Sequence, residues 1–305
     1  MLNDLQKSLM EKVSGLHDIP QGAVALRVNG ETKYYSGTKQ IQIVKRQDGN
    51  GFTANIMADT KGKSLHVPAL IDTENINEDV VNTFNVGQNS DVVIVAGCGI
   101  HNNGKKQSSH NGKHVFMIGE NCHVKYIERH FAEGNSHKQM SPRTEIFLGK
   151  NSVLEIETTQ FEGVDLSERL TNASLQDGAK LYVKEKVVTS GNQHADSTIA
   201  VMLKGKNARA HVISRSVAKD TSTQCFLSSL IGMNECFGRI ECDAIVLDRA
   251  AVSSAPTIFA KDQKASLTHE AQVGRIANEQ LTKLMTLGLT QEEAEQKILE
   301  GFMNS

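Results

Sequence analysis

Short runs of alternating apolar and polar residues fill most of this chain, and they predict β-strands. The first run spans residues 23–28, and similar runs follow at 92–95, 145–148 and 181–187. A period of two is typical of strands that bury one face. Helical spacing occurs only at the two ends. Residues 1–18 are predicted to form an amphipathic helix that ends near Gly15 and caps the end of the domain.

A turn rich in glycine and asparagine recurs between the predicted strands. It occupies residues 87–90, 119–122, 149–152, 177–180, 205–208 and 232–235, so successive turns start 27 to 32 residues apart. Gly and Asn tolerate left-handed backbone conformations, which suits a repeated corner. We therefore expect one supersecondary unit to be repeated along the chain.

Such a period with strands but no helices predicts a stacked, parallel β-helix over residues 19–268. The alternative is a β-sandwich whose loops resemble each other by chance, and six nearly even repeats favour the solenoid. A hexapeptide repeat is absent, which disfavours a left-handed acyltransferase prism.

Residues 269–305 are predicted to form a helical region after the β body. Apolar residues from Val273 to Leu287 have helical spacing, Gly288 interrupts them, and Thr290 with Glu293 forms a capping-box pattern for a second helix. These helices form either a lid or a docking surface for another protein. The apolar residues expected to dock a partner are Ile276, Leu281, Leu284, Ile298 and Phe302.

The composition excludes several functions. Thirty-three basic and 35 acidic residues give a net charge of −2, so a nucleic-acid partner is not expected. The sequence has no Trp, which argues against a sugar- or base-stacking platform, and no apolar run long enough to span a membrane. Five widely spaced cysteines without a signal peptide predict a cytoplasmic protein with reduced thiols.

Cys242, His269 and Glu270 form the most promising set for chemistry. Cys242 and Glu270 lie 28 residues apart, close to one period, so we expect them to stack on adjacent coils. A thiolate is a good ligand for iron and can also carry sulfur, and a carboxylate or imidazole can complete a metal shell. The alternative is that Cys242 is a small buried residue, which is the commoner role of a single cysteine.

The other cysteines carry weaker signals. Cys98 lies between two glycines, which expose the backbone and let another group approach closely. Cys225 and Cys236 lack the tight spacing of zinc or ferredoxin-type sites, and the histidines at 101, 110 and 114 fit no standard zinc signature. The chain also has no P-loop, GxSxG or HExxH motif.

The C-terminal third resembles the SufB/SufD family of iron–sulfur cluster assembly scaffolds. The resemblance is carried by ECDA at 241–244, LTHEA at 267–271, VGRI at 273–276, EQL at 279–281, LGLT at 287–290, EEA at 292–294 and ILEGF at 298–302. It implies a right-handed parallel β-helix and a non-enzymatic scaffold for a transient iron–sulfur cluster, of the 4Fe–4S type.

The resemblance also implies roles and partners. Cys242 is similar to the family's cluster cysteine, His269 and Glu270 to its neighbours, and Cys98 to a cysteine of sulfur uptake, with Cys236 as a further candidate ligand. The implied partners are a SufC-like ABC ATPase on the C-terminal helices, a second copy or a SufD-like paralogue, a sulfur donor and apo recipient proteins. Cys242 with Glu270 favours the SufB type, and the short N-terminus indicates a short branch.

Two alternatives remain at this point. One is a β-helix enzyme acting on carbohydrate, which would need a cleft with convergent carboxylates. The other is a SufD-like structural subunit that holds no cluster.

Overall fold

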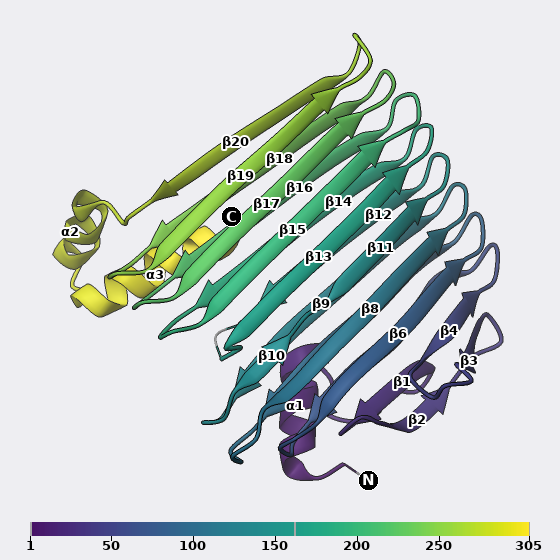
Figure 1. The fold of residues 1–305 in the computed structure, drawn as a ribbon, viewed down its shortest axis with the longest axis horizontal. Helices are drawn as coiled ribbons and strands as arrows, with labels where there is room; N and C mark the ends of the chain where they lie inside the picture. The colour runs from purple at the N-terminus through teal and green to yellow at the C-terminus, as the bar shows by residue number, and fades with distance from the viewer. Residues whose placement is uncertain (1, 162, 305) are drawn as a thin grey trace.

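The structure is a computed structural model that describes residues 2–161 and 163–304. Two long sheets face each other along its length, and most successive strands alternate between them (Figure 1). In spatial order, sheet A contains β2 (Glu31–Ser36), β1 (Ala23–Val28), β5 (Lys61–Ile71), β7 (Asp91–His101), β9 (His123–Glu133), β12 (Val153–Gln160), β14 (Lys180–Thr189), β16 (Arg209–Ala218), β18 (Phe237–Val246) and β20 (Ser266–Gly274). Sheet B contains β3 (Ile41–Lys45), β4 (Gly51–Ile56), β6 (Asn77–Val86), β8 (Ser108–Ile118), β10 (Lys138–Met140) with β11 (Arg143–Leu148), β13 (Leu166–Leu175), β15 (His194–Leu203), β17 (Thr223–Gly232) and β19 (Ala251–Ala260).

From β4 and β5 onward, each strand pairs in parallel with the equivalent strand of the next coil. The molecule is therefore a parallel β-solenoid, as the repeat predicts. Along most strands buried and less buried residues alternate, so one face points into the solenoid and the other points outward.

The repeated turns form one corner of the solenoid. Asn89, Asn121, Asn151 and Asn207 have φ between 55° and 60°, and Gly178 occupies the equivalent turn with φ of 65°. Only a few residue types adopt this left-handed conformation at low cost, Gly and Asn foremost among them. The prediction of a repeated corner from these residues is confirmed.

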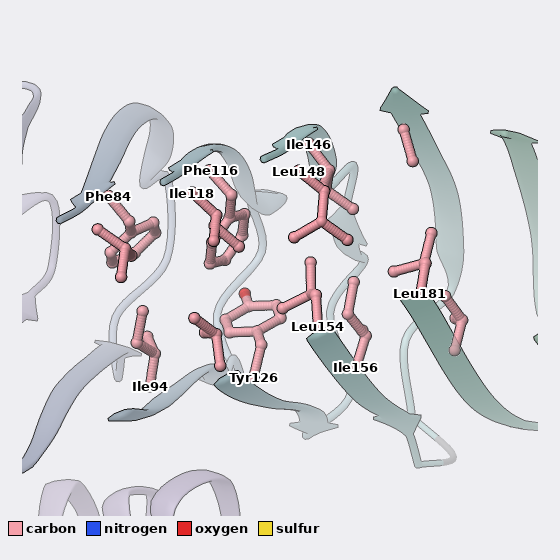
Figure 2. Packing of buried hydrophobic residues seen from close by; sticks show 14 of the residues in the cluster. Phe84, Ile94, Phe116, Ile118, Tyr126, Ile146, Leu148, Leu154, Ile156 and Leu181 are labelled. Atoms are coloured by element: carbon pink, nitrogen blue, oxygen red, sulfur yellow. The ribbon is translucent and has the colours of Figure 1, made fainter. Parts of the chain in front are cut away.

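An apolar core fills the solenoid next to this corner. Figure 2 shows Phe84 and Phe116 of sheet B facing Ile94 and Tyr126 of sheet A. Phe84 and Phe116 stack with ring centroids 4.8 Å apart, and Tyr126 meets Phe116 edge-on at the same distance. Each fully buried side chain of this size contributes roughly 1.5–3 kcal/mol to stability, so this ladder holds the two sheets together.

The N-terminal helix α1 (Asp4–Ser14) ends at Gly15 in a left-handed conformation, as predicted. It does not cap the end of the solenoid, however, and that expectation is wrong. Instead α1 packs on the outer face of sheet A over β5, β7 and β9. Leu9 and Val13 of the helix lie against Gly99 and Gly97, where an added Cβ would lie 3.2 Å or less from its nearest neighbour. The glycines flanking Cys98 therefore admit α1.

The C-terminal end differs from the N-terminal end. β20 continues through Gly274, so the first C-terminal helix, α2 (Asn278–Thr286), starts later than the apolar pattern from Val273 suggests. The second helix, α3 (Gln291–Asn304), follows Gly288, which has φ of 97°. Thr290 and Glu293 exchange hydrogen bonds before α3, which confirms the capping box. Figure 1 shows both helices at the same end as β19 and β20.

Candidate functional site

Cys242 lies inside the solenoid, one coil from its C-terminal end. It belongs to β18, and its side chain is 2% exposed. β20 is the next strand and forms the edge of sheet A, with most of its residues exposed. Cys242 is thus buried in a single chain but separated from the open end by one strand.

The predicted stacking of Cys242 on Glu270 is wrong by one residue. Cys242 pairs with Ala271, whereas Glu270 pairs with Glu241. Because neighbouring residues of a strand point to opposite faces, Glu270 lies on the outer face, where it accepts a hydrogen bond of 3.0 Å from Arg239 Nη2. His269 pairs with Ile240, so its side chain shares the inner face with Cys242.

Two polar side chains share the interior with Cys242 at this end of the solenoid. The Ser254 hydroxyl lies beside the thiol. His269 Nε2, on the inner face of the next strand, is buried and has no hydrogen-bond partner within residues 2–161 and 163–304. Leaving a buried polar group unpaired costs about 1–3 kcal/mol, so this nitrogen would gain from a ligand.

The protonation states at this site follow from burial. Burial raises the pKa of the Cys242 thiol, and the Glu185 carboxylate raises it further, whereas Ser254 and Arg215 lower it. Burial also lowers the pKa of His269. The side chains are therefore a neutral thiol and a neutral imidazole at neutral pH. Binding of a metal by the thiolate would release a proton.

A ladder of polar side chains runs along the inner face of sheet A to Cys242. Its members pair directly from strand to strand and are buried: Glu128, Thr158, Glu185, Ser214 and Cys242. Ser214 lies directly beside Cys242, and its hydroxyl donates to Glu185 Oε2 over 3.3 Å. We call this row the inner ladder.

Arg169 of sheet B neutralises two carboxylates of the inner ladder. Its Nη1 donates to Glu128 Oε2 over 2.6 Å, and its Nε lies 3.4 Å from Glu185 Oε1. Burial raises the pKa of Glu128, but Arg169 and His130 outweigh it and hold that pKa well below its usual range. The Glu128 carboxylate and the Arg169 guanidinium therefore remain charged inside the solenoid.

Cys98 lies beside the far end of the inner ladder. It pairs with His130 on β9, two residues after Glu128, and is 1% exposed. Burial raises the pKa of Cys98 well above its usual range, with Glu78 and Glu128 adding to the effect. Five strand spacings separate β7 from β18 in sheet A, which puts Cys98 and Cys242 roughly 24 Å apart along the axis.

Two histidines of the histidine-rich stretch, His110 and His114, belong to this interior as well, whereas His101 pairs with Glu133 and is partly exposed. His110 Nδ1 lies 2.9 Å from Glu78 Oε2, and Glu78 also pairs with Arg27. His114 contacts the Tyr126 hydroxyl over 2.5 Å, and that hydroxyl donates to Glu128 Oε1 over 2.8 Å. His110 and His114 thus serve buried hydrogen bonds, in keeping with the absence of a zinc signature.

The remaining cysteines do not face this interior. Cys122 and Cys236 occupy the same buried corner position, immediately before a strand, that small residues occupy in other coils: Ser90, Ser152, Ala179 and Ala208. Cys236 is six residues from Cys242, about 20 Å along an extended strand. Cys225 points outward on sheet B between Asp196 and Ser253. Within the described residues, Cys98 and Cys242 are the cysteines of the polar interior.

The described residues form no complete metal site. In the described ranges 2–161 and 163–304, no three His, Cys, Asp or Glu side chains converge to hold a metal ion.

The C-terminal helices present two kinds of apolar residue. Ile298 and Phe302 line a pocket between α3 and the ends of β18 and β20, so they face the sheet. Leu281 and Leu284 of α2 are half-buried, and Ile276 precedes that helix and is also half-buried. The most exposed apolar side chains are Leu287, at 77%, and Met285, at 43%.

The described residues define a class of parallel β-solenoid with a buried cysteine in the penultimate coil and a helical hairpin at the same end. The comparison with known families then identifies the family. Residues 74–302 match the family described as SUF system FeS cluster assembly, SufBD core domain. The chain belongs to the SufBD family.

Similar proteins come from archaea and bacteria. An iron-sulfur cluster assembly SufBD family protein of Pyrococcus horikoshii is 31% identical over 229 residues, covering 74% of this chain and 69% of the relative. A SufBD family protein of Methanothermobacter thermautotrophicus is 26% identical over 302 residues, covering 97% of this chain and 71% of the relative. One from Staphylococcus saprophyticus is 26% identical, covering 92% and 62%.

These findings place the chain in iron–sulfur cluster assembly and leave the carbohydrate-active alternative without support. Within the described residues, no helix is long and apolar enough to cross a membrane.

Proposed function

We propose that this protein is a SufB-like scaffold on which a nascent iron–sulfur cluster is assembled. The observation that carries the proposal is Cys242 in the penultimate coil, with His269 on the same inner face and the Ser254 hydroxyl beside the thiol. Thiolate and neutral imidazole are both ligands of iron–sulfur clusters. Glu270 lies on the outer face of β20, the edge strand that also carries His269. A shift of β20 by one residue would turn the Glu270 carboxylate to the inner face, toward the cluster.

The cluster is cargo in this proposal, of the 4Fe–4S type, and passes to apo recipient proteins. The protein itself catalyses no reaction and works in the cytoplasm with reduced thiols. Its five cysteines are free in the structure, in keeping with this setting.

We further propose that Cys98 takes the outer sulfur of a persulfide on a donor protein, which leaves as the thiolate, and that an external dithiol reductant then frees this sulfur as sulfide. The solenoid interior connects Cys98 to Cys242 and gives the sulfide its route. The inner ladder supports this, because it places polar groups on every strand of sheet A from β9 to β18. A distance of roughly 24 Å is too long for direct transfer between the two sulfur atoms, so an interior route is needed. Cys236 is assigned a corner role in this proposal.

The missing ligands are proposed to come from a second copy of the chain or from a SufD-like paralogue. β19 and β20 form exposed edges at the end near Cys242, with Phe259 53% and Val273 45% exposed. Exposed strand edges with apolar side chains favour pairing with another chain. A partner at this end would cover the edge strand beside Cys242 and could add its own side chains.

Anaerobic reconstitution with iron and sulfide tests the cluster site. We expect wild type to bind iron and sulfide and Cys242→Ser to lose nearly all of both, because serine cannot replace the thiolate. Cys236→Ser is the matched control, since it makes the same change at the corner immediately before the strand of Cys242, and should bind as wild type does. Equal iron content in Cys242→Ser and wild type would refute the site, and no iron in either would favour a SufD-like structural subunit.

The ATPase partner is proposed to dock on the helical hairpin α2–α3. Leu287 and Met285 are its exposed apolar side chains and Leu281 and Leu284 are half-buried, whereas Ile298 and Phe302 face the sheet. Truncation after Gly274 removes the hairpin and leaves all strands. We expect the shortened chain to fold, as judged by circular dichroism, and to lose co-purification with a co-expressed SufC-like ATPase. Undiminished co-purification would contradict the docking assignment.

A further inference from the structure

Arg215 connects the strand of Cys242 to helix α3. On β16, Arg215 directly follows Ser214, and the two residues pair in register with Asp243 and Cys242 of β18. Because side chains alternate, Arg215 and Asp243 lie on the outer face, immediately behind the thiol. There the Arg215 Nη1 forms an ion pair with Asp243 Oδ2.

The other side of Arg215 meets α3. The guanidinium carbon lies 5.6 Å from the centre of the Phe302 ring, within the range of a cation–π contact. Arg215 is 14% exposed at its side chain, so this contact is largely shielded from water. One side chain thus touches both the helix and the residue next to Cys242.

Helix α3 rests on the sheet over a narrow area. In its described range Gln291–Asn304, Ala294 is the buried residue. A pocket of about 430 Å³ lies on one side of α3, between Phe302 and the ends of β18 and β20. A groove of about 670 Å³ lies on the other side, between Leu299 with Met303 and the outer face of sheet A at Phe161 and Val188. Space on both sides allows α3 to shift, because little close packing resists it.

We propose that Arg215 is a positioning residue for Cys242. It couples the position of α3 on the sheet to the accessibility of the Cys242 thiol. When α3 lies on the sheet, Phe302 and Asp243 together fix the Arg215 side chain and hold β16 and β18 in register at Cys242. A protein that docks on the hairpin and displaces α3 removes one of these two supports. The edge formed by β18 and β20 then opens more readily, and Cys242 becomes reachable. This inference rests on the proposed role of Cys242.

Alkylation of the iron-free full-length chain with iodoacetamide tests the coupling, with each cysteine followed separately by mass spectrometry. We expect Arg215→Gln and Phe302→Ala each to speed alkylation of Cys242 by about fivefold or more, the response of a local opening. The double variant should be no faster than the faster single variant, because both changes break one linkage. Cys225, on the outer face of sheet B, provides an internal control whose rate should not change.

Arg209→Gln is the matched control, since it makes the same change on β16 at an exposed position away from α3. Rates of Cys242 within about twofold of wild type in both single variants would overturn the proposal, as would fully multiplicative effects in the double variant. If a variant also speeds alkylation of Cys98, the fold itself is disturbed, and Phe302→Leu is used in place of that variant. Phe302→Leu should also speed alkylation of Cys242, and an unchanged rate would overturn the proposal. Since alkylation needs no iron, this result is independent of the reconstitution that tests the cluster site.

Discussion

The surroundings of Cys98 and Cys242 show how one solenoid interior can hold two cysteines for different purposes. Both thiols are almost fully buried, and both have a raised pKa. Cys98 has three strands of sheet A on one side and six on the other, and it lies near the paired charges of Arg27 and Glu78. Cys242 has a single strand of sheet A between it and the open end, and on the inner face of that strand His269 Nε2 has no partner among the described residues.

This difference separates stability from function along the fold. Paired buried charges hold a region in one arrangement, because each lost partner leaves a charge uncompensated. Unpaired polar groups at an open edge cost stability but remain available to a ligand. We therefore expect substitutions around Cys98 to act mainly on folding and substitutions around Cys242 to act mainly on iron.

The largest stability effect is expected from Arg169→Met. This change leaves Glu128 and Glu185 buried without their cation, and breaking a buried pair in this way costs about 3–5 kcal/mol. Urea denaturation followed by circular dichroism measures the loss. Arg209→Met, on the exposed start of β16, is the control and should change stability by less than about 0.5 kcal/mol. A loss below 1 kcal/mol or so for Arg169→Met would contradict the structural role of the paired charges.

A smaller effect, dependent on pH, is expected at His114. Burial lowers the pKa of His114 from 6.5 to about 4, so the unfolded chain binds a proton between these values and the folded chain does not. Stability is therefore full above pH 6.5 and falls as the pH drops toward 4, by up to about 3 kcal/mol from this group.

The variant His114→Asn should flatten this dependence, measured as the free energy of unfolding at several pH values between 7 and 4. His123→Asn is the control, because His123 is half-exposed between Asp91 and Glu155. An unchanged slope in His114→Asn would show that His114 is not the group that titrates.

The solenoid was predictable because each corner requires a residue with a left-handed backbone, and few residue types tolerate that conformation. Asn121, Asn151 and Asn207 supply such a residue once per coil, so the repeat is visible in the sequence. The place of α1 was not predictable in the same way. Its apolar stripe shows that one face is buried, but the surface it covers depends on Gly97 and Gly99 in a strand far along the chain.

The candidate site was predictable in part. Cys242 and His269 could be singled out as residue types that bind iron. The register of Glu270 could not be predicted, because a coil that is one residue longer or shorter moves a side chain to the other face of the sheet. The inner ladder left a signal that was missed. Glu128, Thr158 and Ser214 each lie seven residues after the turn residues Asn121, Asn151 and Asn207, and Glu185 follows Gly178 at the same interval. Counting from the corner would have aligned them.

The measurement that tests the account most directly compares Cys98→Ser with Cys242→Ser under two sulfur supplies. Each is reconstituted with iron and either inorganic sulfide or a cysteine desulfurase with its substrate, and iron and sulfide are then determined. We predict that Cys98→Ser forms a cluster with inorganic sulfide but not with the enzymatic donor, and that Cys242→Ser forms none with either. A Cys242→Ser protein that assembles a full cluster from inorganic sulfide would contradict the central claim.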